Sequence, residues 1–181
     1  GGAIELLIER VVKNKVAYAL LKSNKKIKLG SRINFVGGHY ATVLERKQKL
    51  FLISFSSNVS KIIEGIGELP LPPYIDREPI QLDSERYQTV YASESGAIAS
   101  PTAGLHFDES MLRELQNKGI NHCFVTLHVG SGTFKPVKEE NILDHEMHAE
   151  WISIGNDACD LILETKKNEG RIVAVGTTSL R

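Results

Sequence analysis

Two kinds of hydrophobic pattern follow one another along the chain, and the change between them divides it into two parts. Up to about residue 56, five short stretches are apolar or alternate between apolar and polar residues, and lysine, asparagine and glycine turns separate them. Such stretches predict strands over 3–12, 15–21, 31–36, 40–46 and 50–55. Five strands at this spacing predict a small antiparallel β-barrel or closed sheet.

Prolines mark the point at which the pattern changes. A short helix predicted over about 60–67 precedes the sequence LPLPPYI, whose three prolines, Pro70, Pro72 and Pro73, favour an extended chain that lacks N–H donors. We therefore place the domain boundary here. The barrel domain is expected over 1–72 and the second domain over 73–181.

Helices and strands alternate in the second part. Strands are predicted over 120–129, 149–155 and 171–176. The predicted helices begin at Asp83 or Ser84, at Asp108 and at Asn156, and they end at about Ala92, Gly119 and Gly170. Alternation of this kind predicts parallel pairing, with ligands at the carboxyl ends of the strands. The expected fold class is α+β and multi-domain, a small antiparallel β-barrel followed by part of an α/β domain with mainly parallel strands.

Composition excludes several classes of protein. The chain is 41% hydrophobic and 24% charged, as soluble globular proteins are. No apolar run approaches the ~20 residues that span a bilayer, so no membrane association is expected. The two cysteines, Cys123 and Cys159, are too few for a disulfide framework or a cysteine-rich zinc site. We expect both to be reduced core residues of a cytoplasmic protein.

The net charge of zero hides an uneven distribution. Residues 1–60 contain 11 lysines and arginines against 3 acidic residues, a net charge of +8, and the remaining residues carry −8. The basic residues cluster on turn-like segments, where long side chains can reach the phosphates of a polyanion. The alternative is a solvated, lysine-rich edge that blocks aggregation between sheets.

Both ends of the chain lie within structural patterns. Gly1 and Gly2 lead directly into an apolar strand pattern, and residues 171–181 form a strand pattern, a turn and the start of a helix. We therefore expect the chain to be a fragment of a longer protein.

Loops rich in glycine and hydroxyl groups flank the predicted strands of the second part. In the sequence HVGSGTF, Gly130 and Gly132 allow the backbone to approach a ligand, while Ser131 and Thr133 offer hydroxyls and amides. It lacks the Gly-Lys-Ser/Thr ending of a phosphate-binding P-loop. A tight turn that requires positive φ explains the same glycines. The sequence GTTSLR repeats the pattern, since hydroxyls at a helix start suit an anion or a ribose.

Histidines and acidic residues add candidate chemistry. His106 ends the sequence PTAGLHF, and His128 lies on a predicted strand. Glu94, in the SESG turn, is a candidate general base or a helix cap. The sequence DHEMHAEW holds His145, His148 and Glu150, which could bind zinc or iron, bind a substrate or be structural. Their spacing is not that of a specific zinc motif.

Four long motifs in this order, YASESGAIASPTAGLHF, TLHVGSGTFKPV, DHEMHAEW and VGTTSLR, resemble those of the S-adenosylmethionine:tRNA ribosyltransferase-isomerases of queuosine biosynthesis. The sequence GELPLPPYI and the preceding strands resemble the inserted barrel of that family. The resemblance covers nearly the whole chain and implies a larger α/β domain that a small β-barrel interrupts. It also implies that portions are missing at both ends.

The resemblance implies transfer of the ribosyl group of S-adenosylmethionine to 7-aminomethyl-7-deazaguanine in the tRNA anticodon. The product would be epoxyqueuosine, with adenine and methionine leaving, and neither a metal nor another cofactor would be needed. The partners would be tRNA and S-adenosylmethionine, and a monomer is expected. The implied acid and base candidates are Glu94, His106 and His128. The implied substrate-binding residues are Ser95, Thr102, Gly104, Gly130, Gly132, Thr133, His145, His148, Glu150, Thr177 and Thr178.

Two other functions fit parts of the sequence. One is a metal-dependent hydrolase built on His145, His148 and Glu150. The other is a non-catalytic RNA-binding module carried by the basic barrel.

Overall fold

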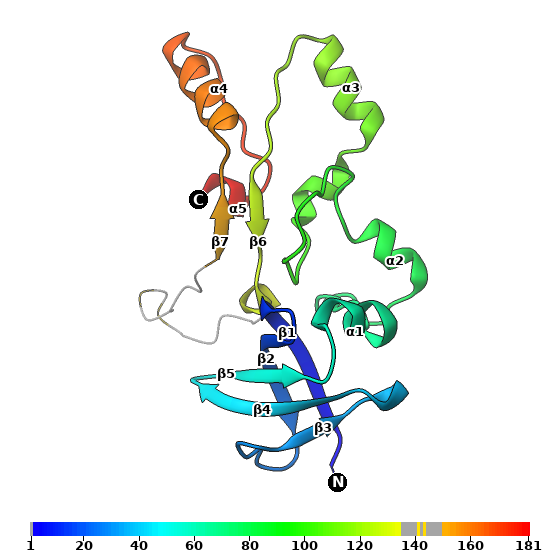
Figure 1. The fold of residues 1–181 in the computed structure, drawn as a ribbon. Coiled ribbons are helices and arrows are strands. Elements are labelled where there is room, and N and C mark those ends of the chain that lie inside the picture. Colours follow the sequence, from blue (N-terminus) through cyan, green and yellow to red (C-terminus); the bar gives the residue numbers. More distant parts are fainter. Residues whose placement is uncertain (1, 135–140, 142, 144–149) are drawn as a thin grey trace. The chain divides into compact units, whose positions relative to one another are not determined.

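The chain separates into two compact units, Gly1–Pro70 and Leu71–Arg181. The computed structural model describes residues 2–134, 141, 143 and 150–181. The first unit is a β-sheet with one helix, and the second is mostly helices and loops (Figure 1). Each unit is described by itself below.

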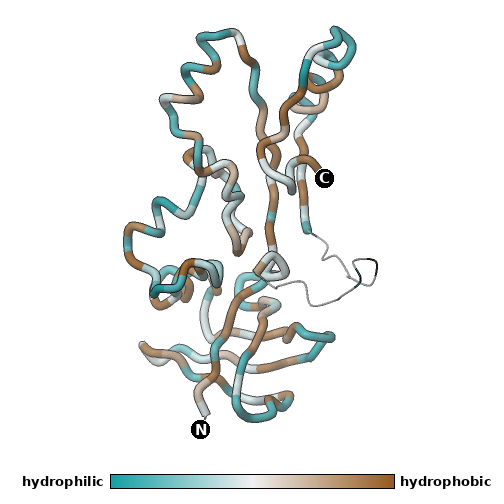
Figure 2. Tube along the Cα trace, turned by 180° about the vertical axis from the view of Figure 1, so that it is seen from behind, coloured by the Kyte–Doolittle hydropathy of each residue, from teal (hydrophilic) through white to brown (hydrophobic). Residues whose placement is uncertain are grey.

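The first unit contains the five predicted strands in a single antiparallel sheet. The strands are β1 (Ile4–Lys13), β2 (Val16–Ser23), β3 (Arg32–Asn34), β4 (Tyr40–Lys47) and β5 (Leu50–Phe55). Their order across the sheet is β1-β2-β5-β4-β3. Hydrophobic positions are concentrated along these strands (Figure 2). The prediction of five short antiparallel strands is therefore confirmed.

The core of the first unit lies on one face of this sheet. Alternate residues of β2, β4 and β5 point to that face, because successive side chains of a strand point to opposite sides. Ala17, Ala41 and Ile53 are fully buried there. Helix α1 (Val59–Ile66) contributes Val59 and Ile62 to the same core, which confirms the predicted helix.

The sheet forms a half-barrel. Among the described strands, the pairing ends at β1 on one side and at β3 on the other, and no pairing joins these two strands. The predicted closed barrel is therefore not found. Strand β3 is only three residues long, and the 3-10 turn η1 (Val36–Gly38) follows it with positive φ at Gly37 and Gly38. A strand this short offers few backbone groups with which to close a barrel.

The described residues of the second unit form two short strands, β6 (Thr126–His128) and β7 (Trp151–Ser153), which pair antiparallel. Its helices are α2 (Gln81–Arg86), α3 (Glu109–Asn117), α4 (Asn156–Lys167) and α5 (Thr177–Leu180), and its 3-10 helices are η2 (Thr102–His106) and η3 (Ser131–Phe134). The expectation of mainly parallel strands is not met in this part of the chain. Residues 171–176, predicted as a strand, are not in one, because an apolar stretch becomes a strand only where a neighbouring strand supplies hydrogen bonds.

The predicted helix starts have mixed outcomes. Asp108 accepts a hydrogen bond from the amide of Met111 at 2.7 Å, so it caps α3 as predicted. Asp83 lies inside α2 and bonds back to the amide of Ile80, and α2 ends at Arg86 instead of Ala92. Asn156 is the first residue of α4 and makes no cap bond, since Gly155 occupies the cap position.

The prediction that both cysteines are core residues is wrong. Cys123 and Cys159 are free thiols with exposed side chains. On α4 it is Ala158, the neighbour of Cys159, that is buried. Among the described residues, none of the helices has the length and apolar character needed to span a bilayer.

Candidate functional site

The SESG loop folds onto the end of β6 in the second unit. The amide of Ile98 donates to the carbonyl of Val129 at 2.9 Å, which holds the loop beside the strand. Gly96 has a φ of +150° and lies against the His128 ring. A Cβ atom at this position would come within 2.5 Å of the ring carbon Cε1 of His128. The loop can therefore approach the imidazole this closely only because residue 96 is a glycine.

His128 is held between Gly96 and an aromatic ring. The antiparallel register places His128 opposite Trp151, and the two rings stack with centroids 4.5 Å apart and planes 28° apart. The Nε2 atom of His128 is buried and has no hydrogen-bond partner among the described residues. An imidazole nitrogen in such a place can exchange a proton with a bound ligand.

Glu150 joins two of the glycine- and hydroxyl-rich loops. The Thr133 hydroxyl donates to its Oε1 atom at 3.3 Å, and the Arg181 guanidinium donates to its Oε2 atom at 3.4 Å. The Glu150 side chain is 13% exposed, whereas that of Arg181 is 52% exposed. Both carboxylate oxygens are therefore engaged in holding η3 near the end of α5.

The two remaining loops also meet each other. Gly176, which precedes α5, has a φ of +96°, and a Cβ atom there would lie 3.5 Å from the Cβ atom of Ala103 in η2. Thr177, the first residue of α5, is exposed, and Thr178 is half-buried. Gly176, the glycine of the sequence GTTS, therefore lies beside Ala103 of the sequence PTAGLHF.

Gly104 has a packing role in this arrangement. It is buried, and a Cβ atom there would collide with the hydroxyl oxygen of Tyr91 and lie 2.9 Å from a methyl group of Thr89. Tyr91 also stacks on Phe124 with ring centroids 4.7 Å apart. Burial raises the pKa of the Tyr91 phenol above its usual value. The absence of a side chain at residue 104 thus allows the half-buried Tyr91 to pack against the loop.

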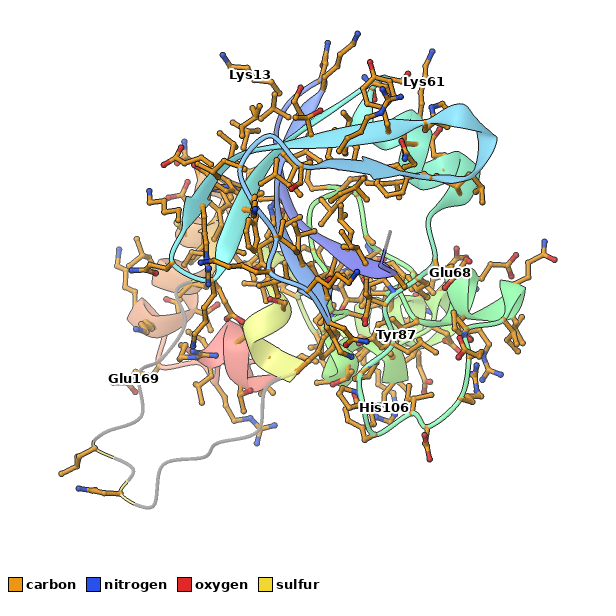
Figure 3. All side chains as sticks on the ribbon, turned by 90° about the horizontal axis from the view of Figure 1, so that it is seen from below. Lys13, Lys61, Glu68, Tyr87, His106 and Glu169 are labelled. Carbon is orange, nitrogen blue, oxygen red and sulfur yellow. The ribbon has the colours of Figure 1, made fainter. Side chains whose placement is uncertain are left out.

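The predicted acid and base candidates are not in contact with one another through hydrogen bonds or ion pairs among the described residues. Glu94, Ser95, Thr102 and His106 are exposed, and His106 lies at the surface (Figure 3). Among the described residues, no hydrogen bond or ion pair connects Glu94, His106 and His128. Gly130 and Gly132 are half-buried on either side of the buried Ser131. His145 and His148 lie outside the described residues.

The described residues include no group of three histidine, cysteine or acidic side chains that could hold a metal ion. The metal-site hypothesis concerns His145 and His148, which the structure does not describe, together with Glu150. Of these, Glu150 already has Arg181 as its charge partner.

Sequence reasoning missed three residues of this region. Trp151 follows Glu150 directly and is the only tryptophan of the chain, which was a usable signal. Gly96 could have been noticed as the glycine of the SESG turn. Arg181 gave no local signal, because its partner lies 31 positions earlier in the sequence.

Comparison with known proteins gives two findings. The sequence model of a protein family described as "Queuosine biosynthesis protein" matches residues 1–181. The crystal structure of S-adenosylmethionine tRNA ribosyltransferase from Thermotoga maritima is similar to this chain, with 21% sequence identity and a TM-score of 0.35. The match covers 98% of this chain, which spans 45% of the length of that protein.

Proposed function

Because this chain belongs to the queuosine biosynthesis protein family, we propose that it takes part in transfer of the ribosyl group of S-adenosylmethionine to tRNA. The acceptor is the aminomethyl group of 7-aminomethyl-7-deazaguanine in the anticodon, and the product is epoxyqueuosine. Adenine and methionine are the leaving groups. The family match over the whole chain is the observation that carries the proposal.

His128 is the strongest candidate for proton transfer. The reaction requires a base that removes a proton from the carbon next to the sulfonium and an acid that protonates the departing adenine. The buried Nε2 atom of His128, which has no hydrogen-bond partner among the described residues, suits either role, and the ring is fixed between Gly96 and Trp151. Glu94 and His106 lie on exposed loops and are the candidates for the second role.

The hydroxyl groups of the neighbouring loops suit the donor ribose. Thr133 is held by Glu150, and Thr177 and Thr178 begin α5 beside η2. Backbone amides at Gly130 and Gly132 can approach a ligand closely, since neither residue has a side chain. Glu150 acts in this scheme through Thr133 and Arg181, as the residue that positions them.

The test is a turnover assay. The chain is incubated with S-adenosylmethionine and tRNA that carries the deazaguanine precursor, and free adenine and ribosylated base are measured. The positive control is a longer protein that contains this chain and has the length of the solved relative. We expect H128A and H106A to slow turnover by a factor on the order of a hundred or more in that longer protein if they transfer protons.

The matched control is His39→Ala, which removes a half-buried imidazole from the first unit and should leave turnover unchanged. Wild-type rates in both the His106 and His128 variants would remove these residues from the mechanism. Adenine release that stops when a chelator is added would favour the metal-dependent alternative instead.

A further inference from the structure

One face of the sheet in the first unit carries two tyrosines, each with an arginine over its ring. The guanidinium carbon of Arg32 lies 3.7 Å from the centroid of the Tyr40 ring, and that of Arg10 lies 5.7 Å from the centroid of Tyr18. A cation over an aromatic face is attracted by the ring's quadrupole, and a planar guanidinium can also stack on it. These two pairs therefore form flat, positively charged surfaces.

Strand alternation places both pairs on the face of the sheet opposite the core. Tyr18 lies between Ala17 and Ala19, which are fully buried, and Tyr40 precedes the fully buried Ala41. The core on the other face is covered by α1. We call the face that bears Arg10, Tyr18, Arg32 and Tyr40 the tyrosine face.

The register orients the arginines of the tyrosine face. Arg10 lies directly opposite Tyr18 across β1 and β2, and Asn34 lies opposite Tyr40 across β3 and β4. The Arg32 Nε group donates to the Asn34 side-chain oxygen at 3.1 Å. This bond fixes the plane of the guanidinium, so that less entropy is lost when a flat ligand binds.

Charge favours a polyanion as the ligand. Residues 1–60 carry a net charge of +8. Among the acidic residues of these strands, Glu5 pairs with Lys22 at 3.2 Å, and Glu45 lies opposite Leu52. Lys13 and Lys61 extend outward from the same unit and add to its positive field (Figure 3). A positive surface with exposed arginines attracts nucleic acid in a salt-dependent manner.

We propose that the tyrosine face binds RNA through unpaired bases that stack on the two arginine–tyrosine pairs. Lysine clusters alone would bind phosphates of any nucleic acid, whereas aromatic and guanidinium planes need bases that have left a helix. An anticodon loop offers such bases next to a phosphate backbone. The inference rests on the proposed function, because that function supplies a tRNA as the partner.

The test compares two RNA probes and three variants of the whole chain. The probes are a labelled stem-loop with an anticodon-type loop and a blunt duplex with the same number of phosphates. In R10Q/R32Q both arginines of the face lose their charge, and the control K25Q/K26Q removes the same charge from two exposed lysines of the β2–β3 connection. In R10K/R32K the charge stays but the planar group is lost. Fluorescence anisotropy at fixed salt gives the affinities.

We expect the wild-type chain to bind the stem-loop more tightly than the duplex. R10Q/R32Q should weaken stem-loop binding by about tenfold or more, and R10K/R32K should stay several-fold weaker than wild type. K25Q/K26Q should cost only about twofold to threefold, as loss of phosphate attraction alone would. Unchanged melting temperatures would show that the variants are folded.

Three results would overturn the proposal. These are equal affinities for stem-loop and duplex, equal losses in R10Q/R32Q and K25Q/K26Q, and full recovery in R10K/R32K. The assay contains no S-adenosylmethionine, so these results leave the ribosyl-transfer proposal intact. Conversely, the transfer assay could fail while the chain still prefers the stem-loop. The tyrosine face would then bind RNA, and the protein would have another activity.

Discussion

Gly96 determines how closely the SESG loop approaches His128. Its φ of +150° is one that side chains rarely adopt, and a Cβ atom there would overlap the imidazole. Gly119, which follows α3, also has a positive φ, but a Cβ atom there would meet nothing within 4 Å. A substitution at Gly119 therefore tests backbone strain alone, whereas one at Gly96 tests backbone strain together with contact with the His128 ring.

Replacement of Gly96 by alanine should displace His128 from its stack on Trp151. We expect G96A to lose about 1–3 kcal/mol of stability from the backbone and to move the His128 ring proton resonances in an NMR spectrum. G119A should cost stability through the backbone alone and leave those resonances in place. Unchanged His128 resonances in G96A would contradict the packing described here.

Asp83 is held in its charged form. The Arg77 guanidinium donates to both carboxylate oxygens at 2.6 and 2.7 Å, and the amide of Ile80 donates at 2.8 Å. These bonds lower the pKa of Asp83 from 3.8 to about 2. A lowered folded-state pKa stabilises the fold above the unfolded-state pKa, and this contribution is lost as the pH falls through the folded value.

The stability difference between wild type and Asp83→Asn should therefore depend on pH. We expect D83N to melt at a lower temperature at neutral pH and the gap to shrink as the pH falls from about 4 to about 2. The nearby exposed Asp76 provides the control, because D76N removes a carboxylate that makes no such bonds with the described residues. A gap that stays constant with pH would count against the Arg77–Asp83 pair.

At the scale of elements, the helix starts show what local sequence can predict. Asp108 and Asn156 both looked like caps, yet only Asp108 bonds to a backbone amide. Glycine is also accepted at the cap position, so the local sequence did not distinguish Gly155, the observed cap, from Asn156. The strands of the first unit were predictable because each one pairs with a strand that is next to it in the sequence.

The two predicted caps give a matched pair of variants. D108A should lower the free energy of unfolding by about 1 kcal/mol, because it removes the bond to the Met111 amide. N156A should have little effect, since that side chain caps nothing. Chemical denaturation measures both, and an equal loss in the two variants would show that Asn156 is a cap after all.

At the scale of the whole molecule, burial differs between the two units. The first unit has ten buried core residues, including Ala17, Ala41 and Ile53 at zero exposure, whereas β6 and β7 contain no buried residue. We expect the amides of β2, β4 and β5 to exchange with deuterium at least about a hundredfold more slowly than those of β6 and β7. Similar protection in all five strands would contradict this difference.

The distance along the sequence between contacting residues explains which parts of the site the sequence could predict. The loops rich in glycine and hydroxyl groups were visible, because composition reveals them locally. The stack of His128 on Trp151 and the pair of Arg181 with Glu150 were not, since they join residues 23 and 31 positions apart. The expected parallel pairing is not confirmed for a related reason, because strand pairing depends on which distant segments lie alongside each other.

The two exposed thiols have a practical consequence. Cys123 lies just before β6 and Cys159 lies on α4, and neither has a hydrogen bond or a metal to protect it within the described part of the chain. Samples stored in air should slowly cross-link into covalent dimers that have nothing to do with biology. The same thiols would accept a pair of spectroscopic labels, one near the candidate site and one on a helix, without any engineered cysteine.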